Sequence, residues 1–161
     1  MFHKELCFWL SIPIKMKKTI ALVTGGFTGE SVVSFKSADF VESKIDWNKY
    51  DVFKIVVLKD EWFYSDSGSV KHLVDKNDFS ITLSGTKIVF DLAFIMLHGA
   101  PGEDGKLQGY FDLLNIPYTS CDALTSALTM NKGYSKAIVH GIKDLHIAKS
   151  VQLFDNTPNS S

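Results

Sequence analysis

Three short apolar runs, each about the length of a single strand, constrain most strongly what this 161-residue chain can fold into. They cover residues 19–24, 52–58 and 90–97, and glycine-containing loops follow the first and the third. Continuous apolar runs rich in β-branched residues are typical of the buried strands of a parallel sheet. Because segments with helical spacing follow two of these runs, the sequence predicts an α/β fold, with a Rossmann-like parallel sheet and flanking helices.

Residues between the second and third runs predict an insertion of a different kind. Segments 61–64, 70–74 and 80–83 are short and are split by turn-rich stretches. We therefore expect a small antiparallel insertion.

Helical spacing and one further apolar run predict the remaining elements. The apolar stripe of the first helix is expected to reach about Ile45. A later helical stretch starts near Asp122 and resumes after Gly133 as far as Leu145. Residues 147–154 are expected to form one more strand.

The charge balance and the cysteines argue against several kinds of partner. Seventeen basic and eighteen acidic residues give a formal net charge of −1, so no basic surface is expected for nucleic acid or an anionic membrane. Cys7 and Cys121 match no metal-ligand or redox spacing, which favours two reduced thiols in a cytoplasmic protein.

Residues 1–15 are expected to be an upstream extension outside the fold, with Met16 beginning the folded unit. Their apolar run at residues 6–10 is a poor signal sequence, because Glu5 and Pro13 interrupt it and no small-residue cleavage site follows. A weak signal or anchor is the alternative.

Residues 25–30 (GGFTGE) lie between a predicted strand and a predicted helix, where free backbone N–H groups can hold a polar or anionic ligand. The stretch is neither G-x-G-x-x-G nor a P-loop, so a tight turn alone would also explain its glycines. Glu30, close to the positive end of the helix, suits either a ligand ammonium or a helix cap.

Residues 98–109 (HGAPGEDGKLQG) combine four glycines, a proline and two adjacent acids at the end of a strand, which indicates a tightly shaped functional loop. His98 could carry a proton or donate a hydrogen bond. Glu103 and Asp104 could ligate a metal, although we favour their capping the helix that begins near Leu107.

Residues 98–132 resemble the N-terminal signature region of the D-alanine–D-alanine ligases, which are ATP-grasp enzymes. The pattern His-Gly-x-x-Gly-Glu-Asp-Gly-x-Leu-Gln-Gly is matched without exception by residues 98–109, and SALTMNK, ending at Lys132, matches a second family stretch. GGFTGESVVS at residues 25–34 resembles the family's first glycine loop, although Ser31 and Val32 replace the usual Arg-Glu pair.

The resemblance implies a role for each matching residue. Glu30 corresponds to the glutamate that contacts the ammonium of the first D-alanine, and His98, followed by Gly99, to the histidine near that substrate. These residues are the expected catalytic and substrate-binding groups. Lys132 corresponds to the lysine that reaches an ATP phosphate, although Asn131 replaces the aspartate that usually precedes it.

The resemblance also implies a domain division and a reaction. Residues 16–119 would form a pre-ATP-grasp substrate domain, and residues 120–161 the incomplete start of an ATP-grasp domain. In the family, ATP phosphorylates one D-alanine and the amine of a second attacks the acyl phosphate, with Mg²⁺ (or Mn²⁺) as cofactor. The metal ligands are expected beyond this chain, so we expect no metal-binding residue here and no dipeptide synthesis by the chain alone.

Two other functions stay open on the sequence: a non-catalytic module that binds D-alanine or pairs with a ligase, and a Rossmann-type oxidoreductase. D-alanine and ATP are the expected ligands, a homodimer is one arrangement left open, and the choice of second substrate is undetermined.

Overall fold

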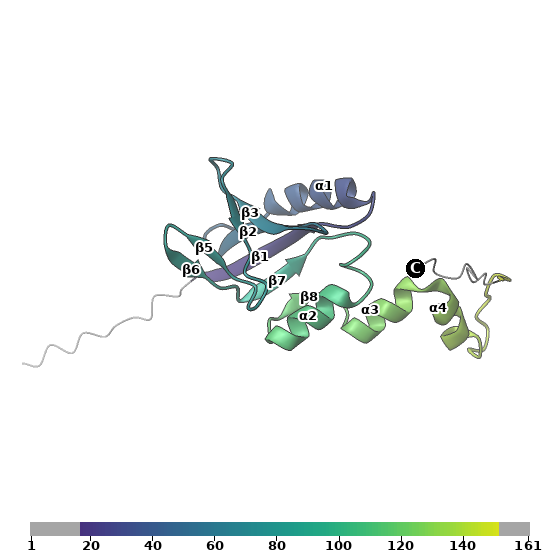
Figure 1. Ribbon diagram of the computed structural model, residues 1–161. Coiled ribbons are helices and arrows are strands. Elements are labelled where there is room, and N and C mark those ends of the chain that lie inside the picture. The colour runs from purple at the N-terminus through teal and green to yellow at the C-terminus, as the bar shows by residue number, and fades with distance from the viewer. Residues whose placement is uncertain (1–16, 152–161) are drawn as a thin grey trace, which may run out of the picture.

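The computed structural model describes residues 17–151 and places a six-stranded, mostly parallel sheet at the centre of the molecule (Figure 1). Its order is β4-β3-β2-β1-β7-β8. The parallel strands are β1 (Lys18–Gly25), β2 (Tyr50–Val57), β7 (Leu92–Ile95) and β8 (Tyr118–Thr119). The predicted α/β fold is confirmed.

The insertion is antiparallel, as predicted, but half of it extends the main sheet. Strands β3 (Trp62–Ser65) and β4 (Lys71–Leu73) add to the β2 edge, whereas β5 (Ile81–Leu83) and β6 (Thr86–Ile88) form a separate two-stranded sheet. The pairing of β3 with β2 covers an edge that would otherwise expose unpaired backbone groups.

Helices α1 (Ser31–Glu42) and α2 (Lys106–Leu114) cover opposite faces of this sheet (Figure 1). The strand order explains this arrangement. The chain steps from β1 to β2 in one direction and from β7 to β8 in the other, and right-handed crossovers in opposite directions place their helices on opposite faces. Such a reversal leaves a crevice at the carboxyl ends of β1 and β7.

The main core lies between the sheet and α2. The Phe79 ring is fully buried, and its centroid lies 4.8 Å from that of Phe111. Trp62 and Tyr110 pack edge-on against the same ring. Full burial of a side chain such as Phe79 or Phe111 contributes about 1.5–3 kcal/mol, so this aromatic cluster anchors the insertion to α2.

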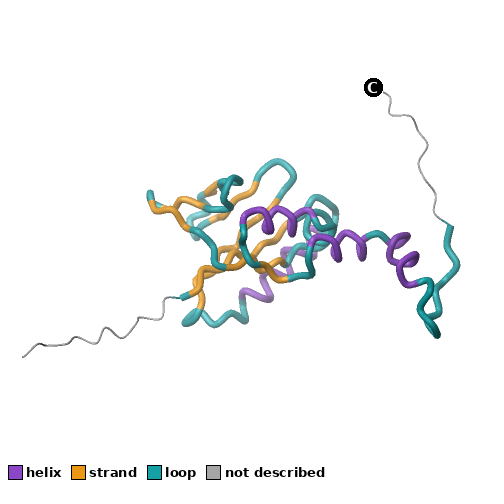
Figure 2. Tube along the Cα trace, turned by 90° about the horizontal axis from the view of Figure 1, so that it is seen from below, coloured by secondary structure: helices purple, strands orange, loops and turns teal. Residues whose placement is uncertain are grey.

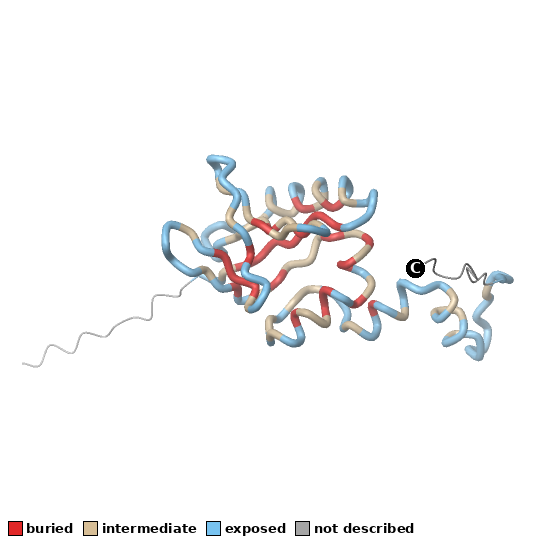
Figure 3. Tube along the Cα trace, in the orientation of Figure 1, coloured by how far each residue is buried: buried red, intermediate tan, exposed pale blue. Residues whose placement is uncertain are grey.

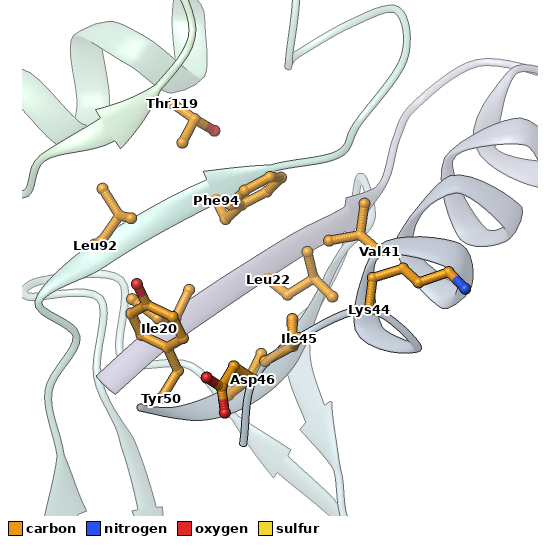
Figure 4. A pocket seen from close by; sticks show the side chains of 11 residues that line it. Ile20, Leu22, Val41, Lys44, Ile45, Asp46, Tyr50, Leu92, Phe94 and Thr119 are labelled. Atoms are coloured by element: carbon orange, nitrogen blue, oxygen red, sulfur yellow. The ribbon is translucent and has the colours of Figure 1, made fainter. Parts of the chain in front are cut away.

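The opposite face of the sheet has a groove of about 410 Å³ beside α1, near the amino ends of the strands (Figure 4). Ile20 and Leu22 of β1 and Leu92 and Phe94 of β7 lie along it. Because the ligand crevice of such a sheet forms at the other end of the strands, this groove is separate from the expected site.

The last described elements are α3 (Ala123–Met130) and α4 (Lys132–Val139), which extend away from the sheet (Figure 2). Most of their surface is exposed (Figure 3), including Tyr134 and Ile138. In residues 17–151 no helix is long and apolar enough to span a membrane.

Several predicted boundaries are wrong. The first helix ends at Glu42, before Ile45, and α4 begins before Gly133 because the Asn131 side chain accepts hydrogen bonds from Gly133 N and Tyr134 N. The same helix stops at Val139, short of Leu145. Residues 147–151 form no strand, and residues 152–154 of that expected strand lie outside the described residues.

Candidate functional site

The two motif-bearing loops meet at the carboxyl edge of the sheet. Strands β1 and β7 pair in parallel, with Val23 opposite Ile95, so the loops that follow these two strands leave the sheet side by side. Phe27 N then donates to Ala100 O at 2.9 Å, which joins residues 25–30 to residues 98–105. The arrangement places two glycine-rich segments where α/β sheets bind ligands.

Glu30 occupies the N-cap position of α1, yet its carboxylate accepts no hydrogen bond from an N–H group of that helix. Its own N–H donates to Thr28 Oγ1 at 3.3 Å, and the Thr28 hydroxyl donates to Glu30 Oε2 at 3.5 Å. The capping role considered for Glu30 is therefore not observed. The exposed carboxylate lies at the positive end of the helix dipole.

Gly99 provides the space beside this carboxylate. Its φ is +72°, and a Cβ built at this position would lie 2.3 Å from Glu30 Oε2 and 2.9 Å from Thr28 Oγ1. Any other L-residue would collide with these atoms as well as being strained. Glu30 and Gly99, 69 positions apart in the chain, therefore lie side by side.

His98 is held from two directions. Ser37 Oγ lies 3.1 Å from its Nε2, and its backbone N–H donates to Ser34 Oγ at 2.9 Å. On the other side of the ring, Glu103 Oε1 lies 3.8 Å from Nδ1. Helix α1 and the loop after β7 thus contact the same imidazole.

The two adjacent acids of the loop have different roles. Asp104 Oδ1 accepts from Lys106 N at 3.2 Å, at the start of α2, although the N-cap residue of that helix is Gly105. Glu103 does not cap that helix, because its Oε2 accepts from Gly99 N at 2.9 Å and its other oxygen faces His98. Among residues 17–151, no group of three or more His, Cys, Asp or Glu side chains is arranged to hold a metal ion.

Gln108 is a structural residue of the site that the sequence analysis missed. It is fully buried, and its Nε2 donates to Gly102 O at 2.6 Å and to Ser120 Oγ at 3.3 Å. These bonds fasten the loop after β7 to the residue that follows β8. A glutamine between two core positions of a predicted helix, Leu107 and Phe111, was the available signal.

Lys132 lies in another part of the molecule. It is the first residue of α4 and lines an open hollow with Lys136 and Met130. The structure brings Glu30, His98 and Gly99 together, whereas no described contact joins Lys132 to them.

The doubly wound sheet, with two glycine-rich loops at its carboxyl edge, defines the class as an α/β domain of the ligand-binding type. Residues 19–121 match the family described as "D-ala D-ala ligase N-terminus". This chain belongs to the D-alanine–D-alanine ligase family, as its resemblance implied.

Individual relatives agree with this assignment. D-alanine–D-alanine ligase of Parabacteroides distasonis is 48% identical over 141 residues, covering 86% of this chain and 42% of the relative. The crystal structure of the Aeromonas hydrophila ligase superposes with a TM-score of 0.71 at 27% identity, over 86% of this chain and 50% of that one. The Bacillus anthracis ligase complexed with ATP has a TM-score of 0.56 at 28% identity, over 76% and 36%. The chain spans about two fifths of the length of the curated relatives it matches.

Proposed function

We propose that this chain provides the first D-alanine site of an ATP-dependent D-alanine–D-alanine ligase of the ATP-grasp superfamily, which makes the dipeptide end of a peptidoglycan precursor. The observation that carries the proposal is the exposed Glu30 carboxylate at the N-terminus of α1, which lies next to Gly99. His98 directly precedes Gly99 in the sequence. A carboxylate that accepts no hydrogen bond from a helix N–H group is suited to bind an ammonium group.

Each site residue has a part in this proposal. Glu30 binds and orients the ammonium of the first D-alanine, and His98 lies beside the same ligand. The Gly99 backbone leaves room for the ligand to approach Glu30. Orientation of this kind favours the acyl-phosphate chemistry, in which an ATP phosphoryl group goes to one D-alanine carboxylate and the amine of the second displaces phosphate.

ATP is proposed to reach this chain at Lys132, at the exposed start of α4. A lysine at the exposed start of a helix is suited to bind a phosphate, because its ammonium charge lies near the positive end of the helix dipole. Mg²⁺ or Mn²⁺ belongs to the proposal only for a complete ligase, since residues 17–151 provide no cluster of metal ligands and no step is assigned to a metal here.

The setting proposed for this function is the cytoplasm, where ATP is available, and a homodimer stays a prediction. The chain alone is proposed to bind D-alanine without joining two of them, in line with the share of the relatives that it spans.

Titration calorimetry with D-alanine tests the substrate site directly. Wild type should release heat on binding, and Glu30→Gln should lower the affinity about tenfold or more, since a charged hydrogen bond contributes about 1.5–3 kcal/mol. Glu61→Gln, whose carboxylate pairs with Lys71, is the matched control. Equal affinity in wild type and Glu30→Gln would remove the proposed role of Glu30.

A further inference from the structure

The imidazole of His98 has a neighbour at each ring nitrogen, and the two neighbours differ in chemistry. Nε2 lies 3.1 Å from the Ser37 hydroxyl, which can donate or accept. Nδ1 lies 3.8 Å from Glu103 Oε1, a carboxylate oxygen, which only accepts when ionised. A neutral imidazole carries a proton on only one of its two nitrogens. The neighbours of the ring therefore determine which tautomer is favoured.

The Glu103 carboxylate favours one of the two positions of the proton. Glu103 is fixed because its other oxygen accepts from Gly99 N at 2.9 Å. A fixed negative charge beside Nδ1 favours a proton on that nitrogen. Nε2 is then unprotonated, and the Ser37 hydroxyl donates its hydrogen to it.

Helix α1 makes a second contact that supports this geometry. Ser34 and Ser37 are three residues apart and lie on one face of the helix. Ser34 is buried and accepts from His98 N at 2.9 Å, while Ser37 contacts the ring of the same residue. The helix therefore holds both the backbone and the ring of His98.

We propose that Ser37 is a positioning residue that, with Glu103, holds neutral His98 in the Nδ1–H tautomer and fixes the orientation of its ring. The tautomer follows from these contacts alone. Its importance for ligand binding rests on the proposed function, since a ring oriented in advance lowers the entropic cost of forming the D-alanine site.

Nitrogen-15 NMR of the labelled chain, at a pH where His98 is neutral, tests the tautomer. In wild type, the His98 Nδ1 signal should be that of a protonated ring nitrogen and Nε2 that of an unprotonated one. Ser37→Ala should give a mixture of both tautomers, and Ser37→Thr, which keeps the hydroxyl, should restore the wild-type spectrum. Ser43→Ala, whose hydroxyl donates to Phe40 O just after the same helix, should leave the spectrum unchanged.

A second variant acts on the other side of the ring. Glu103→Gln removes the charge at an exposed position and should also give a mixture of tautomers. The proposal would be overturned by an unprotonated Nδ1 in wild type, or by a Ser37→Ala spectrum identical to that of wild type. If Ser37→Ala does not fold, the spectrum of Glu103→Gln is the deciding measurement.

D-alanine calorimetry separates this proposal from the one on which it rests. Ser37→Ala should weaken binding about 2- to 12-fold, the range expected for one hydrogen bond of about 0.5–1.5 kcal/mol, and Ser37→Thr should recover it. If wild type shows the Nδ1–H tautomer but binds no D-alanine, the proposed function fails and the tautomer assignment stands. If wild type binds and Ser37→Ala binds equally well, the positioning role fails.

Discussion

Gly99 and Glu30 approach each other so closely that a Cβ at position 99 would lie 2.3 Å from Oε2 of the Glu30 carboxylate. The two residues come from loops that follow different strands, and their proximity depends on the parallel pairing of β1 with β7. The main candidate site is therefore a product of the sheet topology, and the first prediction follows from this contact.

Gly99→Ala is expected to displace the Glu30 carboxylate and to abolish detectable D-alanine binding in calorimetry. The same change should cost about 1–2 kcal/mol of unfolding free energy, because φ is positive there. Gly85→Ala is the matched control, since its φ is +79° but no atom lies within 4 Å of an added Cβ. Equal binding by Gly99→Ala and Gly85→Ala would contradict the role given to this contact.

Phe79→Ala is expected to lower the free energy of unfolding by about 3–5 kcal/mol, as measured by urea denaturation. The ring is fully buried and contacts Phe111, so its removal leaves a cavity between the insertion and α2. Leu113→Ala removes a side chain of α2 that is 84% exposed and should change stability by less than about 0.5 kcal/mol. A loss of similar size in both variants would mean that this core is loosely packed.

Lys132→Ala is expected to weaken the binding of a fluorescent ATP analogue about tenfold, in keeping with the loss of a charge-assisted hydrogen bond. The affinity of wild type should also fall as salt is added, because the interaction is between exposed charges. Lys143→Ala, beyond the end of α4, should bind like wild type. If both variants bind alike, Lys132 has no special part in phosphate binding.

Acid is expected to loosen the β3–β4 turn. The hydrogen bond from Val70 N, and then that from His72, lowers the pKa of Asp66 below its usual value. A carboxyl with a lowered folded-state pKa stabilises the turn above its unfolded-state pKa, and this contribution is lost as the pH falls through the folded-state pKa. The protection of the Val70 amide from hydrogen exchange, relative to its intrinsic rate at each pH, should therefore fall at low pH in wild type. Asp66→Asn should remove this dependence, while Asp60→Asn, before β3, should retain it.

The main strands and the two loops of the site could be predicted from the sequence because their signals are local. Apolar runs with β-branched residues form strands in most contexts, and the glycines around Glu30 and His98 mark the turns directly. The approach of Gly99 to Glu30 could not be derived in this way, since it depends on which strands become neighbours. The role of Glu103 was missed for the same reason, because its partners Gly99 and His98 become close only when the loop folds back.

The second half of the chain was predicted less well, and the cause is physical. Leu145 continued an apolar spacing, but spacing alone does not maintain a helix that has little to pack against, and α4 ends at Val139. The start of α4 was set by the Asn131 side chain, a local cap that outweighs the low helix propensity of Gly133.

Helix α1 carries Glu30 at its N-cap, and Ser34 and Ser37 within its first two turns. All three share one rigid backbone, which packs on β1 through residues such as the buried Ala38. A mutation that tilts or shifts α1 against the sheet would therefore move the Glu30 carboxylate, which is proposed to bind the ammonium, and both histidine contacts together. Affinity for the ligand should then be sensitive to substitutions at the α1–β1 interface that never touch the ligand.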